Sequence, residues 1–341
     1  MEKEPITNYG GREAGRIDWV DSLFTYGMVL VVLGHVILTD ADSSTYLSHW
    51  IYGFHMPLFF WLAGVLFKND TSIGKFALKK ARRLLVPLVV LTCIAYIPKY
   101  YLSDFAFHTV SQDNNVVVSL LRAIVCPDDN PISLMWFLNA LFVVYLIGAV
   151  LAKLIKDKTS LWGLAFLIGA LGMTYLPYIQ ISFFGISLAL YYFPYFCLGI
   201  VSKKIIARLD SQHLLPPRRL LLLFVILNAL YCALICLPVN NYLISITGIF
   251  AAFALMKFLS VNKIRFMPSL RKYTYTIYLL QWFPMVAVRI ILFQILGWDR
   301  WLCCPIMFLA GLYIPVLIGK LALRYIPRKA PGKYALISIG L

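Results

Sequence analysis

Long apolar stretches alternate with short, polar and mostly basic segments along the chain. A helix needs roughly 20 apolar residues to cross a hydrocarbon core about 30 Å thick. The pattern therefore predicts an all-α, polytopic membrane protein with about ten transmembrane helices. The predicted spans are 19–39, 50–67, 84–103, 134–152, 161–178, 182–202, 219–237, 241–259, 273–297 and 301–323. Between the fifth and sixth spans, only Pro177 and a few polar residues up to Ser182 break the apolar run.

The composition agrees with a membrane protein, because 61% of residues are apolar, 13% are charged and the mean hydropathy is +0.80. Soluble domains carry about 25% charged residues. A net charge of +16 would suit a nucleic-acid-binding protein, but the charges fall in alternate loops, as membrane orientation requires. We therefore expect membrane lipids and no nucleic acid among its partners, and a multi-pass location in the cell (inner) membrane.

The distribution of Lys and Arg predicts the orientation. Basic residues fill the N-terminal segment, every second loop and the C-terminal tail. The opposite side holds only Arg122 and Arg300 in its loops and Lys99 near the outer end of the third span. By the positive-inside rule both termini are cytoplasmic. We divide the chain into a cytoplasmic N-terminal segment (1–18), a ten-helix domain (19–325) and a cytoplasmic tail (326–341). Because no cleavable signal precedes it, the first span is expected to be retained.

The seven cysteines give no indication of a metal site or of disulfide bonds. The spacing of the seven cysteines matches neither a zinc site nor a disulfide framework, so no metal is expected.

Residues 104–133 contain VVVSLLRAIVC, whose apolar spacing predicts a short helix at the membrane interface. This connection can cover a site on the outer side or serve as a plain connector.

Two histidines are the main functional candidates. His35 in the first span and His55 in the second both fall in the outer half of the predicted membrane. An ionisable side chain at membrane depth is costly, so it is a functional candidate by default. A single buried imidazole can equally donate to a backbone carbonyl in a helix bundle. Two imidazoles at matching depth favour a functional role.

Further polar residues accompany the histidines. Asn139 and Arg289 fall at a similar depth, and Tyr278 and Gln281 lie nearer the middle of the ninth span. Asp21 lies near the cytoplasmic end of the first span, about 40° from the face that carries His35. We take these residues as candidates for substrate binding. Arg289 can instead snorkel to the interface, and Gln281 can join two helices.

Acyl transfer is a reaction that buried histidines and a basic rim could support. An imidazole with a pKa near 6.5 can take a proton from a hydroxyl and return one to a thiol leaving group. A basic cytoplasmic rim could hold a phosphorylated carrier such as coenzyme A, although the positive-inside rule produces basic loops in any case. The residues assigned to this rim are Arg16, Lys80, Arg82 and Arg83.

Several blocks resemble the integral-membrane acyltransferase type 3 family, in particular fucose acetylase-like and polysaccharide O-acetyltransferases. WVDSLFTYGMVLVVLGH (19–35) and FHMPLFFWLAGVLF (54–67) resemble its first two span blocks, and the second is the more specific match. KKARRLLVP, MWFLNALF, YYFPYFCLGI and YTYTIYLLQW follow in order, so the resemblance covers nearly the whole chain.

The resemblance implies an O-acyltransferase that moves an acetyl or other short acyl group. The donor would be cytoplasmic acetyl-CoA or another acyl-CoA, with no bound cofactor, and the acceptor a hydroxyl of an envelope glycan or lipid-linked sugar. His35 and His55 match the family's histidines in the first and second span blocks. Two positions depart from the pattern: Phe24 stands where a basic residue is usual, and Gln281 where histidine is usual.

Phe24 cannot hold a phosphate, which leaves three readings of the donor site. Arg12 or Arg16 reaches in, the site is altered, or the protein is inactive. Three functions therefore stay open. The first is an O-acyltransferase with His35 as general base. The second is a carrier or flippase for a lipid-linked sugar, and the third is a catalytically silent relative that acts in polysaccharide assembly.

Overall fold

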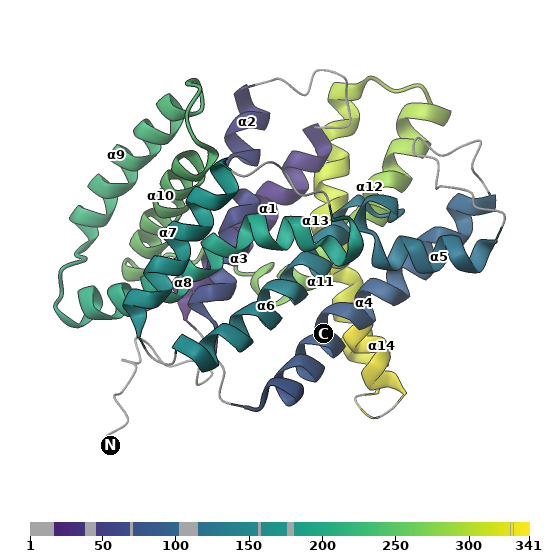
Figure 1. Ribbon diagram of the computed structural model, residues 1–341. Coiled ribbons are helices and arrows are strands. Elements are labelled where there is room, and N and C mark those ends of the chain that lie inside the picture. Colours follow the sequence, from purple (N-terminus) through teal and green to yellow (C-terminus); the bar gives the residue numbers. More distant parts are fainter. Residues whose placement is uncertain are drawn as a thin grey trace.

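The computed structural model describes residues 17–37, 46–68, 71–101, 115–155, 158–175, 181–327, 329 and 331–341. Throughout these ranges the regular elements are helices (Figure 1). The α-helices are α1 (Asp18–Ile37), α2 (Tyr46–Tyr52), α3 (His55–Val65), α4 (Ile73–Tyr101), α5 (Val116–Val125), α6 (Trp136–Ile155), α7 (Thr159–Tyr175), α8 (Ile186–Ser211), α9 (Pro217–Leu234), α10 (Asn241–Val261), α11 (Thr274–Leu280), α12 (Trp282–Val288), α13 (Arg300–Tyr325) and α14 (Gly332–Ser338). Short helical turns are η2 (Pro127–Asp129), η3 (Ser133–Met135), η4 (Phe183–Gly185), η5 (Arg271–Tyr273) and the π-helical η6 (Arg289–Ile295).

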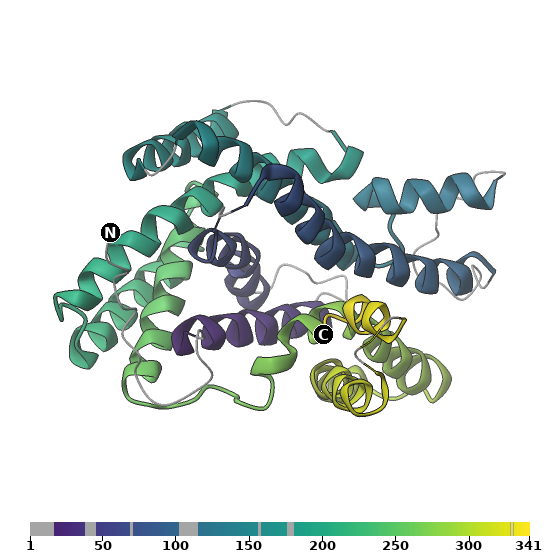
Figure 2. The same cartoon turned by 90° about the horizontal axis from the view of Figure 1, so that it is seen from below.

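Helices α1 and α3 lie in the middle of the bundle (Figures 1 and 2). Helix α1 packs against α3, α10 and α13, and α3 packs closely against α8. Helix α9 lies at one edge of the molecule, packed on α10, and α5 lies at the opposite edge beside the end of α4 (Figure 1). The predicted first and second spans are therefore the centre of the fold.

Two glycines bring α3 and α8 into backbone contact. A Cβ atom at Gly64 would overlap the carbonyl oxygen of Phe196, and one at Gly199 would overlap the carbonyl oxygen of Trp61. In membranes, small residues let helices approach until their backbones touch. The Trp61 indole then donates a 3.1 Å hydrogen bond to Ser202 Oγ on α8.

Six helical segments in the described ranges are long and apolar enough to cross a membrane, which makes this a multi-pass membrane protein. They are Asp18–Ile37, Ser133–Ile155, Phe183–Ser211, Pro217–Leu234, Asn241–Val261 and Trp301–Tyr325. The pair Arg271–Leu280 and Trp282–Ile295, which is bent by 61°, is either a broken seventh span or a re-entrant loop. The predicted second, third and fifth spans correspond to α2–α3, α4 and α7, so ten spans and cytoplasmic termini stay predictions.

The helices differ from the predicted spans in three places. The second span is two helices, α2 and α3, separated by Gly53 and Phe54. The ninth span bends at Gln281, between α11 and α12. The segment predicted as a C-terminal tail contains α14, which packs against α4 (Figure 1).

Other predictions are confirmed or fall outside the described ranges. The helix predicted within the outer connection is α5, and the Asn115 side chain caps it by accepting from the backbone N–H of Val117 at 2.9 Å. The N-terminal residues up to Arg16, including Arg12, lie outside the described residues, as do most of the junction from 177 to 182 and the first part of the outer connection.

Candidate functional site

The two histidines lie on helices that pack against each other, α1 and α3. His35 lies in the last turn of α1 and is half-buried, while His55 opens α3 and is 1% exposed. A Cβ atom at Gly34, next to His35, would lie 3.1 Å from the hydroxyl of Tyr52, whose ring packs on His55. The structure therefore places the two histidines on adjacent helices that meet at Tyr52.

A backbone hydrogen bond orients His55. Its Nδ1 lies 2.9 Å from the carbonyl oxygen of Ile51 on α2, and because a carbonyl only accepts, Nδ1 is the protonated nitrogen. In the neutral ring Nε2 then carries the lone pair. The Tyr52 ring packs edge-on against the imidazole, with 4.8 Å between ring centroids. The break between α2 and α3 thus gives His55 one tautomer and one orientation.

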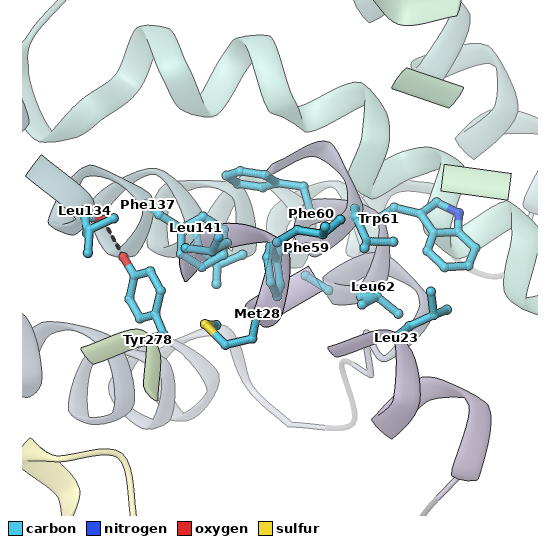
Figure 3. Packing of buried hydrophobic residues seen from close by; sticks show 14 of the residues in the cluster. Leu23, Met28, Phe59, Phe60, Trp61, Leu62, Leu134, Phe137, Leu141 and Tyr278 are labelled. Carbon is cyan, nitrogen blue, oxygen red and sulfur yellow. Dashed lines mark hydrogen bonds between the residues drawn. The ribbon is translucent and has the colours of Figure 1, made fainter. Parts of the chain in front are cut away.

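An aromatic layer lies deeper along α3. Phe59 and Phe60 both pack edge-on against Phe137 of α6, at 5.9 and 5.1 Å between centroids. Tyr278 of α11 joins Phe137 at 5.5 Å, and its hydroxyl donates to the carbonyl oxygen of Leu134 (Figure 3). Met28 of α1 lies between Tyr278 and Phe59 in the same view. Tyr278 is therefore held by packing and by this hydrogen bond.

Phe24 belongs to this apolar packing rather than to an ionic site. Its ring lies 6.1 Å from the ring of Phe59 between centroids. The nearby guanidinium at the start of α1 is that of Arg271, which contacts Asp18 Oδ1 at 3.3 Å and Ser22 Oγ at 2.6 Å. Because residues 22 and 24 are two positions apart on a helix, Arg271 binds the opposite side of α1 from Phe24.

The remaining predicted substrate-binding residues are dispersed. Asn139 is 1% exposed, and its amide nitrogen donates to the carbonyl oxygen of Ile124 at 3.1 Å, which ties α6 to α5. Gln281 is fully buried at the bend between α11 and α12, and both of its amide atoms lack a hydrogen-bond partner within the described structure. Arg289 begins η6, and Asp21 lies in the first turn of α1; both are half-buried.

A basic cavity of about 470 Å³ lies at the start of α4. Its lining residues are Lys75, Leu78, Lys79, Arg82, Arg83, Tyr275, Ile337, Gly340 and Leu341. Two of the four residues predicted for the basic rim, Arg82 and Arg83, line this cavity. Lys80 instead points to α6, with its Nζ 3.4 Å from the centroid of the Tyr145 ring, and Arg16 lies outside the described residues.

Sequence reasoning missed the residues that complete this cavity. Tyr275 donates a 2.7 Å hydrogen bond to the carbonyl oxygen of Arg83, and the Arg83 guanidinium lies 5.6 Å from the centre of the Tyr275 ring. Nothing in the local pattern of residues 332–341 signals that they pack beside α4. Among the described residues no group of three His, Cys, Asp or Glu side chains is placed to hold a metal ion.

Comparison with known proteins identifies the family. A family model described as an acyltransferase domain matches residues 17–320, which is most of the chain. No curated protein and no solved structure matches. The matched region runs from the start of α1 into α13 and contains both histidines and the basic residues of α4. The chain belongs to the acyltransferase 3 family, whose members are enzymes that transfer acyl groups other than aminoacyl groups.

Proposed function

We propose that this membrane acyltransferase moves an acetyl or other short acyl group from cytoplasmic acyl-CoA to a hydroxyl of an envelope or exported glycan. The observation that carries the proposal is the His35–His55 pair, because the two histidines lie on packed helices of the bundle and the imidazole of His55 is fixed as a single tautomer. General acid–base catalysis needs a positioned group of this kind, and a histidine contributes typically 10²–10⁴-fold.

In the proposed reaction His35 is the general base. It accepts the proton of the acceptor hydroxyl while the oxygen attacks the thioester carbonyl, which forms the C–O bond of the ester. The C–S bond breaks, and the imidazolium returns the proton to the departing thiolate. His55 orients His35 or the acceptor from its fixed position on α3. Arg289 and Asn139 steady the acceptor or the oxyanion. The buried Tyr278 and Gln281 and the half-buried Asp21 contribute to acceptor binding.

The donor is assigned to the basic cavity. Lys75, Lys79, Arg82 and Arg83 present four cations to one space of about 470 Å³, within the range of small-molecule sites. Arg and Lys form charge-assisted hydrogen bonds with phosphate oxygens. The cavity supports a donor site that works without a basic residue at position 24, since Phe24 packs on Phe59.

The test is the ester content of envelope glycan in cells that carry His35→Ala, with His49→Ala as the matched control. His49 is an exposed histidine on α2. We expect His35→Ala to abolish the ester acyl groups and His49→Ala to retain them. Unchanged acylation in His35→Ala would remove the role assigned to this residue.

A second arm addresses Phe24. If the natural chain in liposomes does not turn over labelled acetyl-CoA in the presence of acceptor, whereas Phe24→Arg does, the protein is a silent member of its family. We expect turnover by the natural chain.

A further inference from the structure

We propose that the C-terminal segment, residues 332–341, is a wall of the donor cavity and sets how tightly the nucleotide part of the donor binds. This inference rests on the donor site proposed above. The segment supplies three of the nine lining residues, namely Ile337, Gly340 and Leu341. The other lining residues come from α4 and α11, so the cavity forms where these three segments meet.

The end of α14 turns the chain into the cavity. The backbone N–H of Gly340 donates to Ile337 at 3.0 Å, and that of Leu341 donates to Leu336 at 2.9 Å. Gly340 has a φ of +84°, the left-handed conformation that terminates helices and that other residues adopt only with strain. The turn therefore depends on glycine at this position.

Gly340 also lies directly against α11. A Cβ atom at this position would lie 2.8 Å from Tyr275 Cδ1 and 3.3 Å from the backbone nitrogen of Thr276. Only a residue without a side chain allows this approach. Tyr275 in turn donates a hydrogen bond to the Arg83 carbonyl oxygen, so the contact links the C-terminal segment through α11 to the basic residues of α4.

The cavity lining combines two kinds of chemistry. Lys75, Lys79, Arg82 and Arg83 of α4 supply four cations, and Leu78, Ile337, Leu341 and the Tyr275 ring supply apolar and aromatic surface. A ligand with several phosphates and an apolar or aromatic portion matches both, and the nucleotide portion of coenzyme A has this chemistry. An anionic lipid headgroup with its acyl chain shares part of this chemistry, so the experiment separates the two.

The experiment measures binding of 3′-phosphoadenosine 5′-diphosphate to the full chain in phosphatidylcholine nanodiscs. The variant is Gly340→Ala, which introduces both the strain and the collision with Tyr275. Its matched control is Gly297→Ala, because Gly297 has a similar φ of +64° but nothing lies within 4 Å of a Cβ atom there. We expect Gly340→Ala to weaken binding about tenfold or more, and Gly297→Ala to leave it within about twofold of the natural chain.

Arg82→Ala separates failure of this inference from failure of the donor site. If Arg82→Ala weakens binding and Gly340→Ala does not, the donor site stands and the C-terminal wall is wrong. If neither weakens binding, or the nucleotide does not bind, the donor site itself is wrong. Nanodiscs that contain phosphatidylglycerol should leave the nucleotide affinity within about twofold; strong competition would assign the cavity to lipid headgroups and overturn the inference.

Ile337→Ala provides a second readout if Gly340→Ala does not fold, as judged by thermal unfolding. This substitution removes part of the apolar surface that lines the cavity, and it leaves the backbone conformation at Gly340 unstrained. We expect a loss of about threefold or more in nucleotide affinity, and an unchanged affinity would overturn the inference.

Discussion

At the residue scale, the tautomer of His55 is the feature that most constrains the chemistry. Its Nδ1–H is committed to the Ile51 carbonyl, so only Nε2 is available to a second partner. A structural histidine would need the Nδ1 hydrogen bond alone. A histidine that assists His35 or the acceptor needs Nε2 as well.

His55→Asn separates these two roles. The asparagine amide can replace Nδ1–H as the donor to Ile51, but it has no equivalent of Nε2. We expect a folded protein with near-natural thermal stability. Its acyl-transfer rate should fall by about 10²-fold or more. An acyl-transfer rate like that of the natural chain would show that His55 only stabilises the junction of α2 and α3.

The sequence predicts the depth of a residue along its helix, but not which residues it contacts. Span boundaries and the 1.5 Å rise of a helix are enough to place His35 and His55 in one layer. The same reasoning put Asn139 in that layer, but its amide nitrogen binds Ile124 on α5, a contact that depends on how a surface helix folds back. The side on which Phe24 packs also depends on the neighbouring α3, which the sequence of α1 does not reveal.

At the scale of the elements, the contact between α3 and α8 fixes the position of the second histidine. Gly64 and Gly199 allow the two backbones to touch, and Trp61 then bonds to Ser202. His55 stands at the start of α3, so its position follows from that of the helix. Any separation of α3 from α8 should move His55 relative to His35.

Gly199→Ala tests this dependence. The added methyl group overlaps the Trp61 carbonyl, and forcing extra atoms into a packed contact costs about 1–3 kcal/mol or more. We expect a clearly lower melting temperature and reduced acyl transfer. Gly163→Ala on α7 is the control, since its Cβ atom meets nothing within 4 Å, and it should behave like the natural chain. Equal stability of the two variants would contradict the tight contact.

Hydropathy predicts where apolar helices exist but not where they break. The bend at Gln281 and the gap between α2 and α3 both fall inside apolar stretches, which an average over about 20 residues reads as continuous. Long-range contacts lie beside both breaks: the Tyr278 hydroxyl donates a hydrogen bond to the Leu134 carbonyl oxygen, and a Cβ atom at Gly53 would lie 2.5 Å from the Tyr231 hydroxyl. Such contacts join segments far apart in the sequence.

At the scale of the whole molecule, the orientation of the chain in the membrane decides which substrate can reach which site. The basic cavity at the start of α4 belongs on the cytoplasmic side if the positive-inside rule holds, and α5 then belongs on the outer side. The loop charges predict this arrangement directly. The cavity was not predictable as a unit, because its walls come from three segments that meet only in the folded chain.

Accessibility to a membrane-impermeant maleimide tests the orientation. In a chain whose native cysteines are replaced, Gly74→Cys lies at the start of α4 with nothing within 4 Å of its Cβ atom, and Val117→Cys lies on α5, where the natural side chain is 63% exposed. We expect intact cells to label Val117→Cys, and inverted vesicles to label Gly74→Cys. The opposite pattern would invert the topology and place the basic cavity outside.

The central claim is that a histidine pair embedded in the bundle carries out acyl transfer. The most direct measurement is turnover of labelled acetyl-CoA by the purified chain in liposomes supplied with glycan acceptor, compared with His35→Ala and with His49→Ala. We predict transfer by the natural chain and by His49→Ala, and a loss of about 10²-fold or more in His35→Ala. Transfer that survives in His35→Ala at the natural rate would contradict the claim.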